Sequence, residues 1–353
     1  YKITDLQVHP VTGAQLVKKI SAMDFYAYCM MVRGPPYYPN YLLNYGALGN
    51  QFWVDMYAKI ETERLNFLRY NQAQLRAEDY VHLQDAIAGD GHVQDMGQLV
   101  ILPSSFTGGP RYMHERIQDA MTYVRHFGRP DLFITFTCNS QWKEIVAALL
   151  FGQTAQERYD MVSRIFHLKV KKLIKLLRKQ KIFGAVKCFC YSIEWQKRGL
   201  PHADILVWLE ERSTAIQVDK FISAEIPDMS EDPKLHAIVK KHMIHGPCGL
   251  LNPHCVCMKD GSCTKKFPKQ FVSETVTGED GYPKYRRRSP QEGGQSFKLK
   301  MKTGVEVEVD NRWVVPYCPL LSRCFNAHIN VESCHSIKSI KYICKYVNKG
   351  SDQ

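Results

Sequence analysis

The spacing of apolar residues divides the chain into a first part with helical periodicity and a second part in which helices and strands alternate. Between Ile20 and Met31, apolar residues recur at helical spacing, which predicts a helix over about residues 13–32. The proline-rich stretch GPPYYPN then breaks this pattern. Helical spacing resumes over residues 50–87 and predicts one or two further helices, so we expect the first part to be mostly helical.

Short apolar runs in the second part predict strands. The run LFITFT at 132–137 is rich in β-branched and aromatic residues, as strands commonly are. Two further strand-like runs, at 185–196 and 202–209, are separated by the tight connection KRGLP and predict a β-hairpin. Helices are predicted over 111–127, 141–150 and 157–180.

The basic residues are concentrated in the second part. The whole chain has 47 Lys and Arg against 35 Asp and Glu, a net charge of +12. Residues 1–115 hold 9 Lys and Arg against 11 Asp and Glu, a net charge of −2, so residues 116–353 carry +14. This shift places a domain boundary near 100–115, where LPSSFTGGPRY is rich in turn residues. A basic excess of this size favours a polyanionic partner.

The remaining composition excludes several classes of protein. With 45% hydrophobic and 23% charged positions, the chain is typical of a packed globular protein rather than a disordered or fibrous one. No apolar run reaches the roughly 18 residues that a membrane helix needs. The 12 cysteines are too few for a secreted disulfide scaffold of this length, so we expect a reducing compartment in which some cysteines can bind metal.

The helix predicted over 157–180 has a basic surface around an apolar stripe that includes Val170, Leu173 and Leu177. Such a helix can track phosphate groups, but the same pattern is typical of a solvated face on a core-packed helix. The candidate DNA-binding residues are Lys171, Lys172, Lys175 and Arg178, together with Arg111 and Arg198.

Three residues of the predicted hairpin have metal-binding chemistry. His202 and Asp204 are two positions apart on a strand, so their side chains share a face. Glu194 lies on the partner strand and could complete a site for a divalent cation. Taken alone, a histidine and an aspartate near a turn are more often surface or capping residues, so both interpretations stay open at this point.

Two tyrosines near residue 350 have the spacing of a helical face. Tyr342 and Tyr346 are four positions apart, and each is followed three positions later by a lysine, Lys345 or Lys349. A tyrosine beside a cation can act as a nucleophile towards phosphate. The alternative is a pair of aromatic core residues flanked by solvated lysines.

A cluster of cysteine and histidine residues lies in the stretch HGPCGLLNPHCVCMKDGSC. His245 and Cys248 have two residues between them, and Cys257 and Cys263 have five, across a Lys-Asp-Gly turn. Two close pairs joined by a short loop fit a structural zinc site. The alternative is a loop with free thiols in a reducing compartment.

Several long segments together resemble one family, the Helitron transposases. They occur in the family's order and are LPSSFTGGPRYM, FITFTCNSQW, EWQKRGLPHADILVWL, MIHGPCG, CMKDGSCTKKFPK, DNRWVVPY, NAHINVE and SIKYICKYVNKG. The resemblance implies an α+β fold, in which a mainly antiparallel central sheet of an HUH-type Rep (rolling-circle replication initiator) nuclease is flanked by helices. It also implies a mostly helical DNA-engaging domain over 1–112, a Rep endonuclease domain over 113–353, and an embedded zinc-like loop at about 242–269.

The resemblance assigns roles to the candidate residues. PHADI resembles the HUH motif, two histidines around a hydrophobic residue, with Asp204 in the place of the second histidine. A carboxylate ligand favours hard cations such as Mg²⁺ or Mn²⁺. Related nucleases take a third ligand from an acidic residue shortly before the motif, where Glu194 matches by position and Gln196 is second. Tyr342 and Tyr346 match the family's paired catalytic tyrosines, with Lys345 and Lys349 beside them.

The activity that the resemblance implies is nicking and strand transfer of single-stranded DNA at a transposon end, through a 5′-phosphotyrosine intermediate. Family members add a Pif1-like helicase after the Rep domain, so we expect a helicase in the same full-length chain, a nuclear location and no membrane partner. Two other interpretations remain. One is a catalytically decayed module that only binds DNA, for which Asp204 is the supporting feature, and the other is a hydrolytic nuclease that forms no tyrosine adduct.

Overall fold

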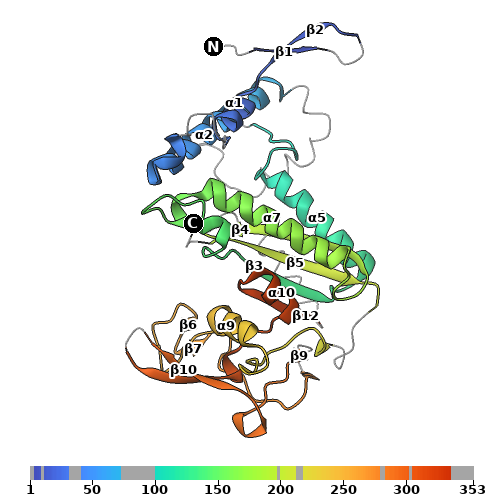
Figure 1. The fold of residues 1–353 in the computed structure, drawn as a ribbon. Coiled ribbons are helices and arrows are strands. Elements are labelled where there is room, and N and C mark those ends of the chain that lie inside the picture. Colours follow the sequence, from blue (N-terminus) through green and yellow to red (C-terminus); the bar gives the residue numbers. More distant parts are fainter. Residues whose placement is uncertain are drawn as a thin grey trace. The chain divides into compact units, whose positions relative to one another are not determined.

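The structure is a computed structural model, and it describes residues 4–8, 12–31, 41–72, 100–196, 199–211, 218–278, 283–301 and 304–334. The chain divides into two units, one formed by residues 1–114 with 149–159 and the other by 115–148 with 160–353 (Figure 1). The DNA-engaging and endonuclease roles expected for domains 1–112 and 113–353 stay predictions. None of the described helices combines the length and apolar character needed to cross a membrane.

The first unit begins with a β-hairpin rather than a helix. Strands β1 (Thr4–Val8) and β2 (Gln15–Lys19) pair antiparallel, and α1 (Ala22–Cys29) starts only after Ser21, whose side chain accepts a hydrogen bond from the backbone N–H of Asp24 at 3.1 Å. The single helix predicted over 13–32 is therefore wrong for residues 13–21. Pairing with β1 supplies the backbone hydrogen bonds of β2, and the serine cap fixes the helix start.

The long helix of the first unit agrees better with the sequence. A 3₁₀ turn (Tyr41–Asn44) leads into α2 (Ala47–Tyr70). Leu68 is buried on this helix and Phe52, Met56 and Ile60 are half-buried, as the apolar spacing predicts, whereas Leu65 is 38% exposed. Residues 73–87 of the predicted helical region lie outside the described residues.

A four-stranded antiparallel sheet forms the centre of the second unit. Its strand order is β12 (Ile329–Ser333), β3 (Leu132–Thr137), β5 (Pro201–Leu209) and β4 (Val186–Trp195). The strand predicted at 132–137 and the hairpin of β4 and β5 are confirmed, and so is the antiparallel mixed α and β character of this part of the chain.

Helices pack against both faces of this sheet. Helix α7 (Tyr159–Arg178) covers one face, where Phe136 of β3 lies against Phe166 with ring centroids 5.3 Å apart. On the other face, Leu206 and Trp208 of β5 pack against α5 (Pro110–Phe127). The helix predicted over 141–150 is only α6 (Lys143–Val146), because the chain leaves the second unit after residue 148.

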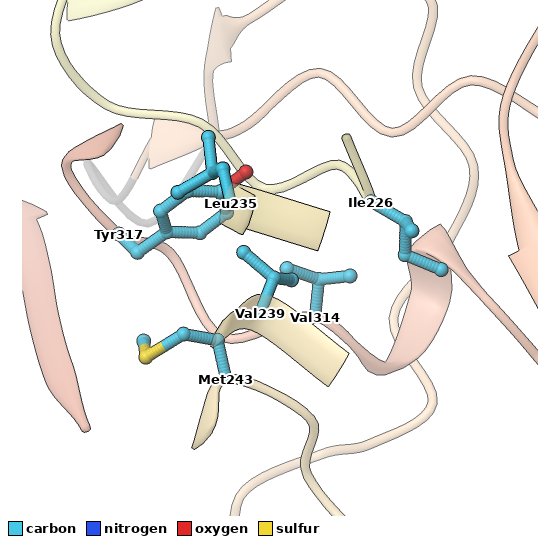
Figure 2. Packing of buried hydrophobic residues seen from close by; sticks show 6 residues of the cluster. All are labelled: Ile226, Leu235, Val239, Met243, Val314 and Tyr317. Carbon is cyan, nitrogen blue, oxygen red and sulfur yellow. The ribbon is translucent and has the colours of Figure 1, made fainter. Parts of the chain in front are cut away.

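The segment between β5 and β12 forms its own core. Helix α9 (Pro233–His242) packs through Leu235 and Val239, together with the C-cap residue Met243, against Val314 and Tyr317 (Figure 2). The segment from 314 to 317 then leads through α10 (Pro319–Phe325) into β12. The remaining strands of this segment are β6 (Met258–Lys259), β7 (Ser262–Cys263), β8 (Val276–Thr277), β9 (Pro283–Lys284), β10 (Ser296–Lys300) and β11 (Glu306–Asp310).

A buried arginine holds this segment together. The Arg287 guanidinium donates hydrogen bonds to the backbone carbonyls of Ala224, Asn311 and Val314, the last two at 2.6 and 2.7 Å. These charged hydrogen bonds tie the segment around residue 224 to the 3₁₀ turn at Asn311–Trp313, just before the chain returns to the sheet. The inserted segment therefore positions the last strand, β12.

Candidate functional site

Two rows of mainly polar residues cross the face of the sheet opposite α7. Residues directly opposite each other on neighbouring strands share a face. The strand register gives a first row of Thr137, His202 and Glu194, and a second row of Asn330, Thr135, Asp204 and Ser192. We call these seven positions, together with His328 described below, the polar rows.

The three candidate metal ligands lie together at the centre of the polar rows. Nε2 of His202 is 3.4 Å from Oδ2 of Asp204, along the same strand, and 3.8 Å from Oε2 of Glu194, across the strand pair. Asp204 is only 3% exposed and accepts a hydrogen bond of 2.6 Å from the Thr135 hydroxyl. The sequence-predicted residues thus converge on one point, with one carboxylate oriented by a neighbouring strand.

Charge at this point is shared between the imidazole and the carboxylates. Burial acts to lower the pKa of His202, but the hydrogen bond to Asp204 and the charges of Asp204 and Glu194 outweigh burial and raise it above the usual histidine value. The two carboxylates thus favour positive charge at this point.

Strand β12 adds two residues that the sequence analysis did not single out. The backbone N–H of Thr137 donates to the carbonyl of His328 at 2.9 Å, so His328 continues the first row, and Asn330 stands in the second. The sequence did carry a signal for them. In NAHINVE the polar residues His328, Asn330 and Glu332 alternate with apolar ones, which is the pattern of a half-buried strand.

Buried polar atoms in the polar rows lack hydrogen-bond partners among the described residues. They include Oγ of Ser192, Nδ1 of His202, Nδ1 of His328 and Oδ1 of Asn330. An unsatisfied buried polar atom costs free energy, and such atoms rarely gather in one place without a function. This concentration supports a polar ligand at this face.

The acid stability of the protein should depend on His328. Burial, together with the nearby His242, lowers the pKa of His328 to about 4. The value in an unfolded chain is about 6.5, so the unfolded state binds this proton first as pH falls. The folded state should therefore lose stability as pH falls from about 6.5 to about 4. In thermal unfolding followed by circular dichroism, His328→Asn should show a flatter dependence of Tm on pH in this window than the unchanged protein.

The matched control for this measurement is His254→Asn, because His254 is an exposed histidine. It should leave the slope of Tm against pH as it is in the unchanged protein. An equally steep slope for His328→Asn would contradict the assignment of the acid loss to His328.

The four residues predicted to bind zinc also come together. The donor atoms of His245, Cys248, Cys257 and Cys263 all lie within 4.8 Å of one another, and Sγ of Cys263 is 3.4 Å from Nε2 of His245. A tetrahedral zinc ion with Zn–S bonds near 2.3 Å holds its ligand atoms about 3.5–3.8 Å apart. The group could therefore hold a metal ion such as zinc.

Local structure explains why these four residues meet. Asp260 and Gly261 both have positive φ, 50° and 74°, so they form the tight turn that joins β6 to β7 and brings Cys257 close to Cys263. The backbone N–H of His245 donates to the carbonyl of Trp313 at 2.8 Å, and the Phe267 ring stacks on the His245 ring at 4.2 Å. The second ligand pair is thus held by a hairpin and the first by the core of the inserted segment.

One thiol of the cluster has a pKa that suits a metal, whereas burial raises the pKa of Cys248 and of Cys257. Burial acts to raise the pKa of Cys263, but hydrogen bonds from the backbone N–H groups of Phe267 and Lys265 outweigh it and hold the pKa below the usual value. A lowered pKa favours the thiolate, which is the form that binds metal. Cys255 lies 3.5 Å from Cys257, sulfur to sulfur, but is outside the group of four.

The other candidate residues are placed unevenly. Lys171, Lys172, Lys175 and Arg178 are exposed on α7, and Arg111 is half-buried on α5. Arg198 and the predicted catalytic residues Tyr342, Lys345, Tyr346 and Lys349 lie outside the described residues.

Comparison with known proteins identifies the family. The model of the Helitron helicase-like domain at the N-terminus matches residues 25–207, just over half of the chain. The matched region includes β3, β4 and β5, and with them Glu194, His202 and Asp204, but ends before the cysteine cluster and β12. No curated protein matches the chain. The chain therefore belongs to the Helitron helicase-like N-terminal domain family and is a transposon-related protein.

Proposed function

We propose that this protein is an HUH-type endonuclease that nicks single-stranded DNA and transfers the cut strand through a 5′-phosphotyrosine intermediate. The observation that carries the proposal is the convergence of His202, Asp204 and Glu194 within the polar rows, where side-chain atoms of Ser192, His202, His328 and Asn330 lack hydrogen-bond partners among the described residues. The substrate is the single-stranded end of a transposon, the site of action is the nucleus, and a helicase in the same full-length chain supplies the strand.

The three central side chains fit a hard divalent cation. One imidazole nitrogen and two carboxylate oxygens are ligands that Mg²⁺ or Mn²⁺ accept, and the polar rows leave further polar atoms nearby. A bound cation would polarise the scissile phosphate and stabilise charge on the leaving oxygen. The protein's own part is to orient Asp204 through Thr135 and to hold the phosphate against this face.

The environment of Asp204 favours an active enzyme over a decayed one. A residue left behind by decay has no reason to be both 3% exposed and hydrogen-bonded across strands. The Thr135 hydroxyl and the His202 ring both point polar groups at this carboxylate. These contacts support Asp204 as a ligand and count against the binding-only alternative.

The nucleophile in this proposal is Tyr342, and Tyr346 serves a second step. As the Tyr342 oxygen attacks phosphorus its hydroxyl proton passes to solvent, the O3′–P bond breaks, and the leaving oxygen takes a proton from solvent to become a 3′-hydroxyl. The 5′-phosphate stays joined to the tyrosine, so the bond is kept for rejoining. A tyrosine hydroxyl, with a pKa near 10, needs a nearby cation for this reaction, and Lys345 lies three positions after Tyr342.

Adduct mapping tests the proposal directly. Single-stranded transposon-end DNA carrying a label on either side of the nick is reacted with the full chain in Mn²⁺ or Mg²⁺. The protein is then digested with a protease, and the peptide that carries the DNA is sequenced. We expect the label on the 5′-phosphate side to follow Tyr342. Tyr342→Phe should lose this adduct completely, because the phenol oxygen forms the bond.

The control variant is Tyr346→Phe, which should keep the first adduct and lose the second strand-transfer step. An adduct on Tyr346 alone would reverse the order of the two tyrosines. Cleavage without an adduct would establish the hydrolytic alternative, and binding without cleavage would establish the decayed module.

A further inference from the structure

A stripe of large apolar side chains follows the outer strand of the sheet on the face that α7 covers. Phe189, Tyr191, Ile193 and Trp195 alternate along β4, and β4 lies at an edge of the described sheet. Tyr191 is 45% exposed and Trp195 is 44% exposed, and the Phe189 and Tyr191 rings are nearly parallel with centroids 6.3 Å apart. The edge thus presents flat aromatic surfaces in a line.

Helix α7 places a basic flank beside this stripe. Arg164, His167, Lys171 and Arg178 recur at i, i+3, i+7 and i+14, which puts them on one face of the helix. Arg164 and His167 line a hollow of about 340 Å³ together with Trp195 and Ile193. We call the surface formed by the stripe and this flank the β4–α7 groove.

The two sides of the groove run alongside each other for their whole length. At the other end, the Arg178 guanidinium lies 5.6 Å from the centroid of the Phe189 ring. The 14 residue steps from Arg164 to Arg178 rise about 21 Å on a helix, and the six steps from Phe189 to Trp195 span about 20 Å on a strand. The helix and the strand are therefore matched in length and antiparallel.

From this arrangement we infer that the β4–α7 groove binds single-stranded DNA, with bases stacked on Tyr191 and Trp195 and phosphates held by the basic flank of α7. Aromatic faces beside a positively charged track are what proteins use to bind single strands without reading their sequence. A duplex does not fit this chemistry, because its base faces are already stacked on one another.

This inference rests on the proposed function and deepens it by giving the substrate a path. Trp195 follows Glu194 directly, so the two side chains lie on opposite faces of β4. A strand held in the groove passes the end of the β4–β5 hairpin and reaches the polar rows around that edge. The groove thus holds DNA beside the site without occupying it.

Binding is measured by the fluorescence anisotropy of a fluorescein-labelled oligothymidylate with the full chain, in buffer without Mg²⁺ or Mn²⁺ so that no cleavage occurs. Trp195→Ala should weaken binding by about tenfold, within the range found when a stacking aromatic residue is truncated. Trp195→Phe keeps an aromatic face and should restore most of the affinity. Arg178→Ala should lower the slope of log affinity against log salt by about 0.7, the value for one lost phosphate contact on a single strand.

Two exposed residues outside the groove serve as matched controls. Lys179→Ala removes an exposed charge that follows the last residue of α7 and is not part of its basic flank, and Phe151→Ala removes a fully exposed aromatic ring. Both should bind DNA as the unchanged protein does. Unchanged affinity in Trp195→Ala and Arg178→Ala, with strong binding by the unchanged protein, would overturn the groove and leave the proposed function intact.

The remaining outcomes are equally decisive. No binding of single-stranded DNA by the unchanged protein would overturn both the groove and the proposed function. Tighter binding of oligouridylate than of oligothymidylate, lost in Trp195→Ala, would overturn the assignment to DNA and make RNA the occupant.

Discussion

Alanine in place of His202 is expected to lower the rate of single-strand nicking by on the order of 10²–10³-fold, the loss typical of removing one group that stabilises transition-state charge. Nε2 of His202 lies 3.4 Å from Asp204 and 3.8 Å from Glu194, so its loss removes the only nitrogen donor among the three proposed ligands. The protein should remain folded, because Nδ1 of this ring has no hydrogen-bond partner among the described residues. Single-turnover cleavage of labelled DNA in saturating Mn²⁺, with circular dichroism on the same sample, measures both effects.

His254→Ala is the control, since it removes an exposed imidazole far from the hairpin in sequence. It should nick DNA at the normal rate. Normal nicking by His202→Ala would remove the polar rows from the mechanism, whereas loss of nicking together with loss of the circular dichroism signal would mean that His202 is needed for folding instead.

Removal of zinc should have the second large effect, this time on stability. The loop between His245 and Cys263 has only a two-stranded hairpin of two residues a side, so the metal would supply much of its free energy of folding. Elemental analysis should find about one zinc per chain. Cys257→Ser should abolish zinc binding. If the free energy of unfolding falls by about 3 kcal/mol as a result, Tm should fall by about 6–12 °C for a unit of this size.

Two other cysteines provide the comparison. Cys255→Ser tests the thiol that lies 3.5 Å from Cys257 but outside the group of four, and Cys324→Ser tests an exposed thiol on α10. Both variants should keep zinc and Tm. If Cys255→Ser lost zinc and Cys257→Ser kept it, Cys255 and not Cys257 would be the zinc ligand. If the unchanged protein contained no zinc, the loop would hold free thiols instead of a metal.

Local pattern was enough to predict the centre of the sheet. LFITFT and the hairpin around KRGLP are strands whose partners follow from short connections and apolar alternation. The close approach of His202, Asp204 and Glu194 follows from the same two facts, because i and i+2 share a face and a tight hairpin fixes the register. These features could be predicted because they depend only on residues close together in the sequence.

Other features depended on partners that local pattern does not identify. Residues 15–19 have apolar spacing that suits a helix, but pairing with β1 overrides it. Strand β12 is visible as an alternating run, yet nothing near His328 or Asn330 indicates that they face Thr137 and Thr135. The roles of Tyr342 and Tyr346 stay predictions, since these residues lie outside the described part of the chain.

The pairing of β12 with β3 has a consequence for the order of assembly during synthesis. Ile329 stands opposite Phe136, a separation of 193 residues, and the inserted segment lies between them. Closing so long a loop is slow unless the intervening chain has already folded. A ribosome-bound chain that has released β3, β4 and β5 but not β12 holds His202 and Glu194 without His328 and Asn330. Under the proposed function, we expect the nascent protein to begin cutting DNA only after the inserted segment has folded and delivered the last strand.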